Sequence, residues 1–251
     1  MIGGIIIGDE ILRGKREDRH LAKLIELLGA RGLKLDWAEY LGDHPALITS
    51  TLKRTFASGD IVFSFGGIGA TPDDHTRACA AAAAGVELCL HPDAEAQMRA
   101  YFKSEITQFR LQMGEFPRGS TIIPNPYNRV PGFSIGDHHF VPGFPIMAWP
   151  MVEWVLDERY AHLFNTRTDA ETSVIVYDLF ESTITPLMID IEAQFWGVKT
   201  FSLPSIGDDG RRRHIELGVR GVPDQVAAAI ADMKIGVAAL GGTWEEPGPE
   251  G

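Results

Sequence analysis

The sequence contains little cysteine and no long apolar run. Only two of its 251 residues are cysteines, Cys79 and Cys89, and their spacing is neither that of a metal site nor that of a redox pair. We expect buried, reduced thiols and a cytoplasmic location, because disulfides are rare in that compartment. No stretch reaches the roughly 18 apolar residues of a membrane span, and no basic segment followed by a long apolar run opens the chain. The sequence therefore predicts no signal peptide and no membrane partner.

Positive charge is also scarce. The chain has 23 Lys and Arg residues against 34 Asp and Glu residues, which gives a formal net charge of -11. Nucleic-acid binders usually carry a basic surface, so we expect no nucleic-acid partner. An anionic ligand would have to be held by local dipoles, a few cations or a metal ion. The hydrophobic content of 45% is that of a soluble globular protein with a hydrophobic core.

The amino-terminal part of the chain alternates short apolar runs with amphipathic segments. Residues 2–8 and 61–65 are mostly apolar, which is typical of strands buried on both faces of a parallel sheet. Residues 20–31 and 45–58 carry apolar side chains at helical spacing. A hairpin is expected over residues 133–141. The pattern predicts an α/β fold with a layered sheet and functional loops at the carboxyl ends of its strands.

A second, smaller set of elements follows residue 166. Strands are expected at 172–177, 198–203 and 214–219, and helices at 183–195 and 223–240. These elements make a βαββα module of the α+β class. The predicted domains are a main domain over 1–165, a small domain over 166–240 and a disordered tail over 241–251, which is rich in glycine, proline and glutamate.

The stretch over residues 60–76 leads from a strand to a helix through glycines. Three of them follow the apolar strand: Gly66, Gly67 and Gly69. Thr71 is expected to cap the helix that comes next, and Gly85 is expected to end it. Bare backbone N–H groups at such a turn, beside a helix amino-terminus, bind phosphate readily. The stretch therefore indicates an anion site.

Acidic residues follow three of the expected strands. Asp9 and Glu10 come directly after the first strand, and Asp73 and Asp74 fall in the first turn expected for the glycine-led helix. Two aspartates would repel a phosphate unless a divalent cation lay between them, and oxygen ligands suit Mg²⁺. The alternative is that these aspartates only complement the helix dipole. Asp43 either orients a base or ribose, or caps the helix that begins near residue 45.

Four stretches in this order resemble the molybdopterin-binding (MoaB/Mog-like) domain family. They are Gly8-Asp-Glu-Ile-Leu12, Leu41-Gly-Asp43, Gly66-Gly-Ile-Gly-Ala-Thr-Pro-Asp-Asp-His-Thr76 and Pro142-Gly-Phe-Pro145. The likeness is strongest to the amino-terminal region of CinA-type competence/damage-inducible proteins. The small βαββα module resembles their KH-like middle domain, so the resemblance covers nearly the whole chain.

The resemblance implies a three-layer αβα fold around a mixed, mainly parallel sheet, and a homo-oligomer. It also implies a pocket for a small-molecule ligand, either a pterin or an adenine nucleotide with its phosphates. In the molybdenum-cofactor branch the ligand is molybdopterin, which is adenylylated or receives its metal. In the CinA-like branch the domain is linked to hydrolysis of diphosphates such as ADP-ribose or FAD. Both chemistries need Mg²⁺ or another divalent cation.

The resemblance also implies roles for particular residues. Catalytic roles fall on Asp9, Asp73 and Asp74, and metal binding falls on Asp9, Glu10, Asp73 and Asp74. Contacts to ligand and phosphate fall on Gly66, Gly67, Gly69, Thr71, Thr76, Asp43, Gly143 and Pro145. One segment departs from the family: its usual Asp-Thr-Asn is replaced by Asp18-Arg-His20 in a shorter loop. Arg19 and His20 are therefore candidates for the positive charge that the acidic chain lacks.

Three functions remain open on the sequence alone. The first is a metal-dependent pyrophosphatase of the CinA-like kind, and the second is molybdopterin binding or adenylylation. The third is a non-catalytic ligand-binding or interaction module. The small domain lacks the GXXG loop with which KH modules clamp RNA, in agreement with the acidic composition. Phe144 and Trp149 are expected to pack in the core or in a subunit contact.

Overall fold

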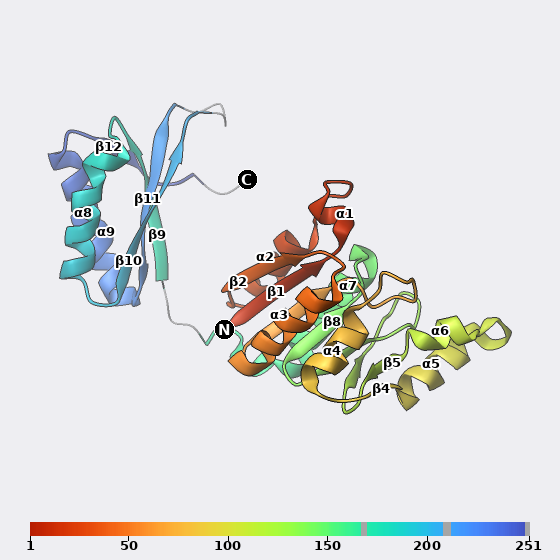
Figure 1. Ribbon diagram of the computed structural model, residues 1–251. Coiled ribbons are helices and arrows are strands. Elements are labelled where there is room, and N and C mark those ends of the chain that lie inside the picture. Colours follow the sequence, from red (N-terminus) through yellow and green to blue (C-terminus); the bar gives the residue numbers. More distant parts are fainter. Residues whose placement is uncertain (167–169, 208–211, 249–251) are drawn as a thin grey trace. The chain divides into compact units, whose positions relative to one another are not determined.

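The computed structural model describes residues 1–166, 170–207 and 212–248, which belong to two compact units (Figure 1). The first unit spans Met1–Thr166 and the second spans Arg167–Gly251. Each unit has its own sheet and its own hydrophobic core. Within the described residues, every helix is too short or too polar to cross a membrane.

The first unit is built on a six-stranded mixed sheet with the strand order β2-β1-β3-β8-β7-β6. Four neighbouring strands run parallel: β2 (Trp37–Leu41), β1 (Ile2–Ile7), β3 (Ile61–Phe65) and β8 (His138–Val141). Next to β8, β7 (Gly132–Ile135) pairs antiparallel with it, and β6 (Thr121–Ile123) pairs antiparallel with β7. The hairpin between β7 and β8 lies where the sequence predicts it. Because parallel strands end at one edge of a sheet, the loops that follow β1, β3 and β8 meet there.

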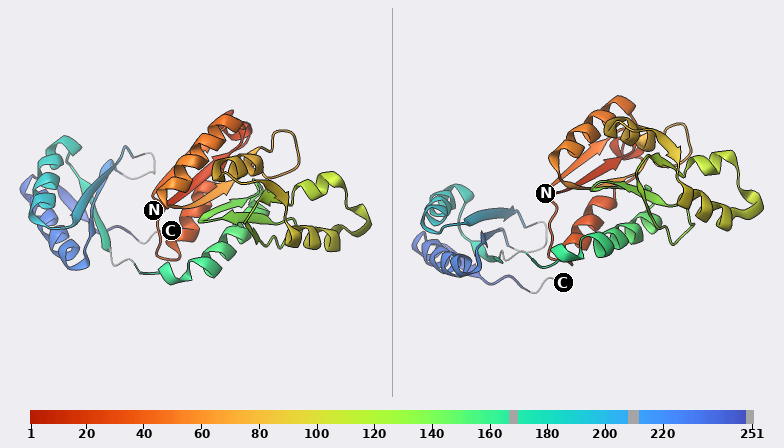
Figure 2. Two further views of the ribbon diagram at one scale, coloured as in Figure 1. Left: turned by 60° about the horizontal axis from the view of Figure 1, so that its bottom comes forward. Right: turned by 90° about the horizontal axis from the view of Figure 1, so that it is seen from below.

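Helices cover both faces of this sheet, which gives three layers (Figure 2). One face carries α2 (His20–Gly29) and α7 (Pro145–Arg159), and the other carries α3 (Pro45–Ser58) and α4 (Thr76–Ala84). Ile6 of β1 packs in the first core and Ile5 in the second. Since successive side chains of a strand point to opposite faces, β1 must be apolar along its whole length.

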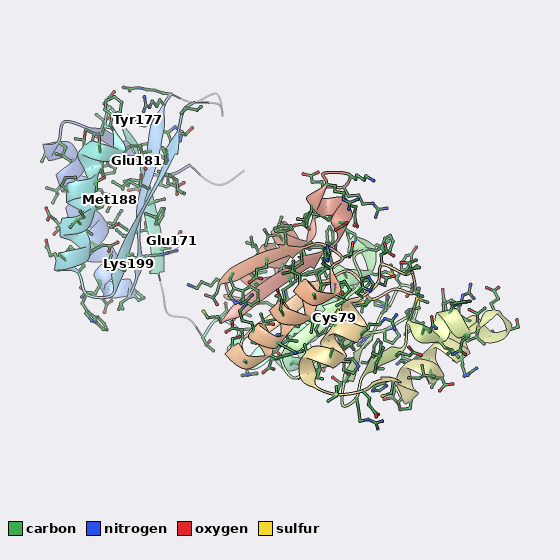
Figure 3. The ribbon with its side chains drawn as sticks, viewed as in Figure 1. Cys79, Glu171, Tyr177, Glu181, Met188 and Lys199 are labelled. Carbon is green, nitrogen blue, oxygen red and sulfur yellow. The ribbon has the colours of Figure 1, made fainter. Side chains whose placement is uncertain are left out.

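Shorter elements extend the first unit. A two-stranded sheet and two helices lie between α4 and β6: β4 (Leu88–Leu90), α5 (Pro92–Phe102), α6 (Gln108–Gln112) and β5 (Glu115–Pro117). Single turns are α1 (Asp9–Leu12), η1 (Lys103–Glu105) and η2 (Ala161–Leu163). Both cysteines are free thiols; Cys79 of α4 is buried beside α3 (Figure 3), whereas Cys89 is only half-buried.

The second unit is a four-stranded antiparallel sheet in the order β10-β11-β9-β12, with two helices packed on it. Its elements are β9 (Ala170–Tyr177), α8 (Glu181–Gln194), β10 (Val198–Ser205), β11 (His214–Gly221), α9 (Pro223–Ala239) and β12 (Thr243–Glu245). Apart from β12, this is the βαββα order expected from the sequence. The sequence also predicts a turn at residues 207–211, between the last two expected strands, and all of it except Gly207 lies outside the described residues.

Two local expectations are wrong. The segment from residue 241 was expected to be disordered, but Thr243–Glu245 forms β12 on the free edge of β9. Gly241, with φ of 86°, turns the chain back after α9 and makes this pairing reachable. In addition, α4 begins at Thr76 rather than directly after Thr71. Thr71 therefore does not cap a helix, and Asp73 and Asp74 lie in the loop that precedes it.

Candidate functional site

The loops that follow β1, β3 and β8 line one cavity of about 540 Å³. After β1 the lining residues are Glu10 and Arg16, and after β8 they are Pro142, Gly143 and Phe144. The loop after β3 contributes Gly67–Thr71, Asp73 and Asp74. Because these strands are parallel neighbours, segments far apart in the sequence converge at their carboxyl edge. The cavity therefore occupies the place where α/β proteins of this kind bind ligands.

Gly66 and Gly67 are required by close backbone packing. Gly66 has φ of 99°, and a Cβ there would lie 2.3 Å from the carbonyl oxygen of Ile7. Gly67 has φ of 68°, and a Cβ there would lie 2.2 Å from Thr76 Oγ1. Thr76 is fully buried, and its hydroxyl donates to the Gly66 carbonyl at 3.0 Å. Thr76 and Gly66 thus fix the conformation of the loop without lining the cavity, whereas Gly67 and Gly69 line it.

Asp74 also shapes the loop. Its Oδ2 accepts hydrogen bonds from the backbone N–H of Thr71 at 2.8 Å and from the Thr71 hydroxyl at 2.5 Å. Asp73 is more exposed, and hydrogen bonds from Thr71 and from its own backbone N–H lower its pKa. Asp73 is therefore an ionised carboxylate at the mouth of the cavity. The helix-dipole alternative does not hold for either aspartate, because neither lies in the first turn of α4.

Arg77 connects the glycine loop to α6 through hydrogen bonds. The sequence did not predict it as a functional residue. Its guanidinium is buried and donates to the carbonyl oxygens of Gly69, at 2.6 Å, and of Gln112. A weaker contact of 3.4 Å reaches the carbonyl oxygen of Glu115. Burial lowers the pKa of Arg77, with Glu115 and Asp74 opposing that shift. The available signal in the sequence was a single arginine at the start of an alanine-rich helix, three residues after Asp74.

Asp9 and Asp43 hold the loops after β1 and β2 together. The backbone N–H of Asp9 donates to Asp43 Oδ2 at 2.9 Å, and that of Asp43 donates to Asp9 Oδ1 at 3.2 Å. Arg13 donates to the other oxygen of Asp9 at 2.6 Å. Burial raises the pKa of Asp43, the hydrogen bond from the Asp9 backbone N–H opposes that shift, and the charges of Asp9, Glu10 and Asp73 add to it. The carboxylates of these loops are thus close enough to interact, and Asp43 makes no side-chain cap on α3.

The donor groups suit a cation held jointly by protein and ligand. Glu10, Asp73 and Asp74 line the cavity, whereas Asp9 is engaged by Arg13 and by the backbone of Asp43. Among residues 1–166, 170–207 and 212–248, no three acidic, histidine or cysteine side chains are grouped closely enough to hold a metal alone. Mg²⁺ is commonly bound by one or two carboxylates together with substrate phosphates, and oxygen-only donors of that kind are present here.

His20 does not supply the positive charge expected of it. Asp18 accepts hydrogen bonds from the backbone N–H groups of His20, at 2.8 Å, and Leu21, at 3.2 Å, and so fixes the start of α2. The ring of His20 is buried, stacks on Phe65, and places Nε2 3.1 Å from the Gly143 carbonyl oxygen. Burial lowers the pKa of His20, so its imidazole is neutral at neutral pH. The cation that lines the cavity is Arg16.

The sequence did not predict that the residues of the remaining cavity wall line the site. It includes Asn125, Asn128 and Met147, and the two asparagines hydrogen-bond to each other at 2.8 Å. Phe144 was expected in the core or a subunit contact, but 55% of its surface is exposed and it lines the cavity. Pro145 opens α7 and lines the cavity next to this one instead. Gly143, which the resemblance predicts to contact the ligand, lines the cavity.

Comparison with known proteins agrees with the resemblance seen in the motifs. The model of the family described as "Probable molybdopterin binding domain" matches residues 3–162. A CinA-like protein of Syntrophotalea carbinolica is 33% identical over 145 residues, which cover 55% of this chain and 35% of that protein. A CinA-like protein of Desulforapulum autotrophicum is 32% identical over 205 residues, which cover 76% of this chain and 48% of that protein. The chain thus spans half or less of the length of these two curated relatives.

A solved structure shows the same fold. The crystal structure of the protein CinA with unknown function from Thermoplasma acidophilum matches with a TM-score of 0.57 and 25% identity. The match covers 62% of this chain and 97% of that one. The predicted fold class, a three-layer α/β unit with a small α+β unit, is therefore confirmed.

Proposed function

Because this chain belongs to the family of probable molybdopterin binding domains, we propose that its cavity binds a pterin or an adenine nucleotide and hydrolyses a diphosphate bond. ADP-ribose and FAD are substrates of this type. One observation carries the proposal: the glycine loop, the carboxylates of Glu10 and Asp73, and Arg16 line a single cavity of about 540 Å³. A polyphosphate needs each of these groups, namely N–H donors, a cation and carboxylates that can share a metal ion.

The glycine loop offers its backbone to the phosphates. Within the described part of the chain, the N–H groups of Gly67, Ile68 and Gly69 make no hydrogen bond, so they remain able to donate to a ligand. The absence of side chains at Gly67 and Gly69 makes room for Thr76 Oγ1 and Asp74 Oδ2, which would lie 2.2 Å and 2.5 Å from a Cβ at these positions. The turn that results can present its N–H groups to a phosphate. Arg16 also lines the cavity and adds the charge that backbone donors lack.

The apolar part of the cavity suits a planar ring. Met113, Val130, Phe144 and Met147 contribute to its wall. Thioether and aromatic side chains pack well against flat heterocycles, and neither kind distinguishes a pterin from an adenine. This region of the cavity therefore accounts for ring binding, and the loops account for the phosphates.

Glu10 and Asp73 are the residues to which we assign the metal, together with the ligand phosphates. A divalent cation such as Mg²⁺ would neutralise the diphosphate and polarise the phosphoryl group that is attacked. Asp73, ionised because hydrogen bonds lower its pKa, accepts a hydrogen bond from the attacking water and orients it. Asp9, Asp43 and Asp74 keep the loops in place through the bonds described above.

A release assay tests the proposal. The protein is incubated with ADP-ribose or FAD and Mg²⁺, and AMP is measured by chromatography. We expect AMP with at least one of the two substrates, and none when EDTA is present. Binding without any release of AMP would contradict the hydrolytic function.

Molybdopterin binding or adenylylation is the second candidate. The description of the matching family and the apolar ring wall favour it. Saturable binding of molybdopterin to a protein that releases no AMP from ADP-ribose or FAD would select this function instead.

A further inference from the structure

Three carbonyl oxygens of the glycine loop accept hydrogen bonds from the first two residues of α4, Thr76 and Arg77. The Thr76 hydroxyl donates to the Gly66 carbonyl at 3.0 Å, and the Thr76 backbone N–H donates to the Gly67 carbonyl at 2.9 Å. The guanidinium of Arg77 donates to the Gly69 carbonyl at 2.6 Å. A free carbonyl oxygen repels an anion, so engaging these three favours a loop that presents its N–H groups to a phosphate.

Arg77 lies behind the glycine loop rather than in the main cavity, the one of about 540 Å³. Its side chain is buried and does not line that cavity, whereas Gly69 does. The guanidinium also donates to the carbonyl of Gln112, the residue before Met113, and Met113 lines the same cavity. One side chain thus fixes two parts of the cavity wall without lining the cavity itself.

The charge of Arg77 has little compensation for its burial. Within the described residues, its hydrogen-bond partners are backbone carbonyls, none of the ion pairs includes it, and its Nε is buried without a partner. Asp74 and Glu115 act on it only from beyond ion-pair distance. At the start of α4 the helix dipole also disfavours a cation. A buried charge costs free energy unless an opposite charge lies near it, and an anion bound at the glycine loop would supply that charge.

We propose that Arg77 is a positioning residue for the phosphates of the ligand, and that its charge favours anionic ligands over neutral ones. This proposal rests on the proposed function. By holding the Gly69 carbonyl, Arg77 keeps the N–H groups of Gly67, Ile68 and Gly69 available to the ligand; within the described residues they make no hydrogen bond. Its charge attracts the diphosphate through the loop, without contact.

Two ligands that differ in charge test the role of Arg77. One is ADP-ribose in which methylene replaces the oxygen between the phosphates, so that it resists hydrolysis. The other is adenosine, which carries no phosphate. Affinities are measured by NMR titration in Mg²⁺ for the wild type, Arg77→Met and Arg77→Lys. Methionine removes the charge and the donors, whereas lysine keeps the charge.

The matched control is Arg31→Met. The side chain of Arg31 is 16% exposed and forms an ion pair with Asp157, and Arg31 does not line the main cavity. Its loss removes a largely buried arginine from the same unit without touching the glycine loop. The control therefore separates general destabilisation of the unit from an effect on the phosphates.

Arg77→Met should weaken binding of the ADP-ribose analogue about 10-fold or more, because hydrogen bonds from a charged group are lost. It should leave the affinity for adenosine within about 2-fold of the wild type, since adenosine has no charge to attract. Arg77→Lys should weaken binding of the analogue by only about 3-fold, because the charge remains while the forked donor is lost. Arg31→Met should alter neither affinity.

Amide resonances give a readout that needs no variant. Binding of the analogue to the wild type should move the amide proton resonances of Gly67, Ile68 and Gly69 downfield, as new hydrogen bonds do. Binding that leaves these resonances unmoved overturns the proposal, whether or not Arg77→Met folds.

The affinities can overturn the proposal as well. If Arg77→Met weakens binding of both ligands equally, or of neither, Arg77 has only a structural role and the proposal fails while the main site stands. If the wild type does not bind the analogue, the proposed function is overturned and the role of Arg77 with it.

Discussion

Asp9 and Asp43 each accept a hydrogen bond from the other's backbone N–H, at 3.2 Å and 2.9 Å. The two residues follow neighbouring parallel strands, β1 and β2, and their exchange of bonds locks those two loops together. Glu10, the next residue in the chain, is thereby held at the wall of the main cavity. The sequence presents Asp9 as a candidate for catalysis and Asp43 as a candidate for ligand binding. In the structure the two also hold neighbouring loops together through hydrogen bonds.

Asp43 should make stability depend on pH. Burial and the neighbouring carboxylates raise its pKa, so between its ordinary and raised pKa the folded state binds more protons than the unfolded state. The free energy of unfolding should therefore fall as pH rises through that interval. Asp43→Asn cannot titrate there, so its urea-derived free energy should fall less steeply from pH 3.5 to 6, an interval set by the ordinary aspartate pKa of about 4. Identical slopes for variant and wild type would refute the role assigned to Asp43.

A side chain at position 67 should destabilise the protein. A Cβ there meets Thr76 Oγ1, whereas at Gly59, with a similar φ of 72°, a Cβ meets nothing within 4 Å. Gly59→Ala should lower the free energy of unfolding by about 1 kcal/mol, the cost of left-handed backbone alone. Gly67→Ala should lower it by about 3 kcal/mol, because overpacking adds to that cost. Denaturant unfolding of both variants makes the comparison, and equal losses would count against the close packing of the loop.

Tyr160 should be important for stability through a buried hydrogen-bond chain. Its hydroxyl donates to Asp137 Oδ1 at 2.8 Å and lies 2.7 Å from His139 Nε2, whose other nitrogen lies 2.8 Å from Ser134 Oγ. Tyr160→Phe leaves the His139 N–H without an acceptor, so we expect the free energy of unfolding to fall by about 2 kcal/mol.

The control for that variant is Tyr101→Phe, at a half-exposed tyrosine of α5. Its midpoint of thermal unfolding should match that of the wild type. A Tyr160→Phe protein as stable as this control would show that the chain of hydrogen bonds contributes nothing.

Asp73 should be needed for turnover rather than for folding. Asp73→Asn removes a charge at an exposed position and should slow AMP release about 100-fold, with little change in the thermal midpoint. Asp93→Asn, at an exposed aspartate in the first turn of α5, is the control and should leave the rate unchanged.

Asp74→Ala should behave differently from Asp73→Asn. The side chain of Asp74 holds the Thr71 turn, so its loss should reduce both the thermal midpoint and AMP release. An Asp73→Asn variant with full activity would contradict the catalytic role proposed for that carboxylate.

The sequence by itself determined the secondary structure that carries the site. The unbroken apolar runs of β1 and β3 require helices on both sides, and glycine at positions 66 and 67 marks a loop where no side chain fits. These features are local, since hydrophobic period and backbone freedom depend only on near neighbours. The ordered motifs also predicted the family and, with it, the fold.

Only the tertiary structure decided what individual polar residues contact. His20 and Arg77 look like surface cations in the sequence, yet both are buried by elements distant in the chain, His20 against Gly143 and Arg77 against Gln112. Asp9 meets Asp43 across neighbouring strands, and β12 forms because β9 has a free edge. Burial and pairing of this kind depend on which segments converge in space, and the chemistry of a carboxylate or an imidazole follows from those neighbours.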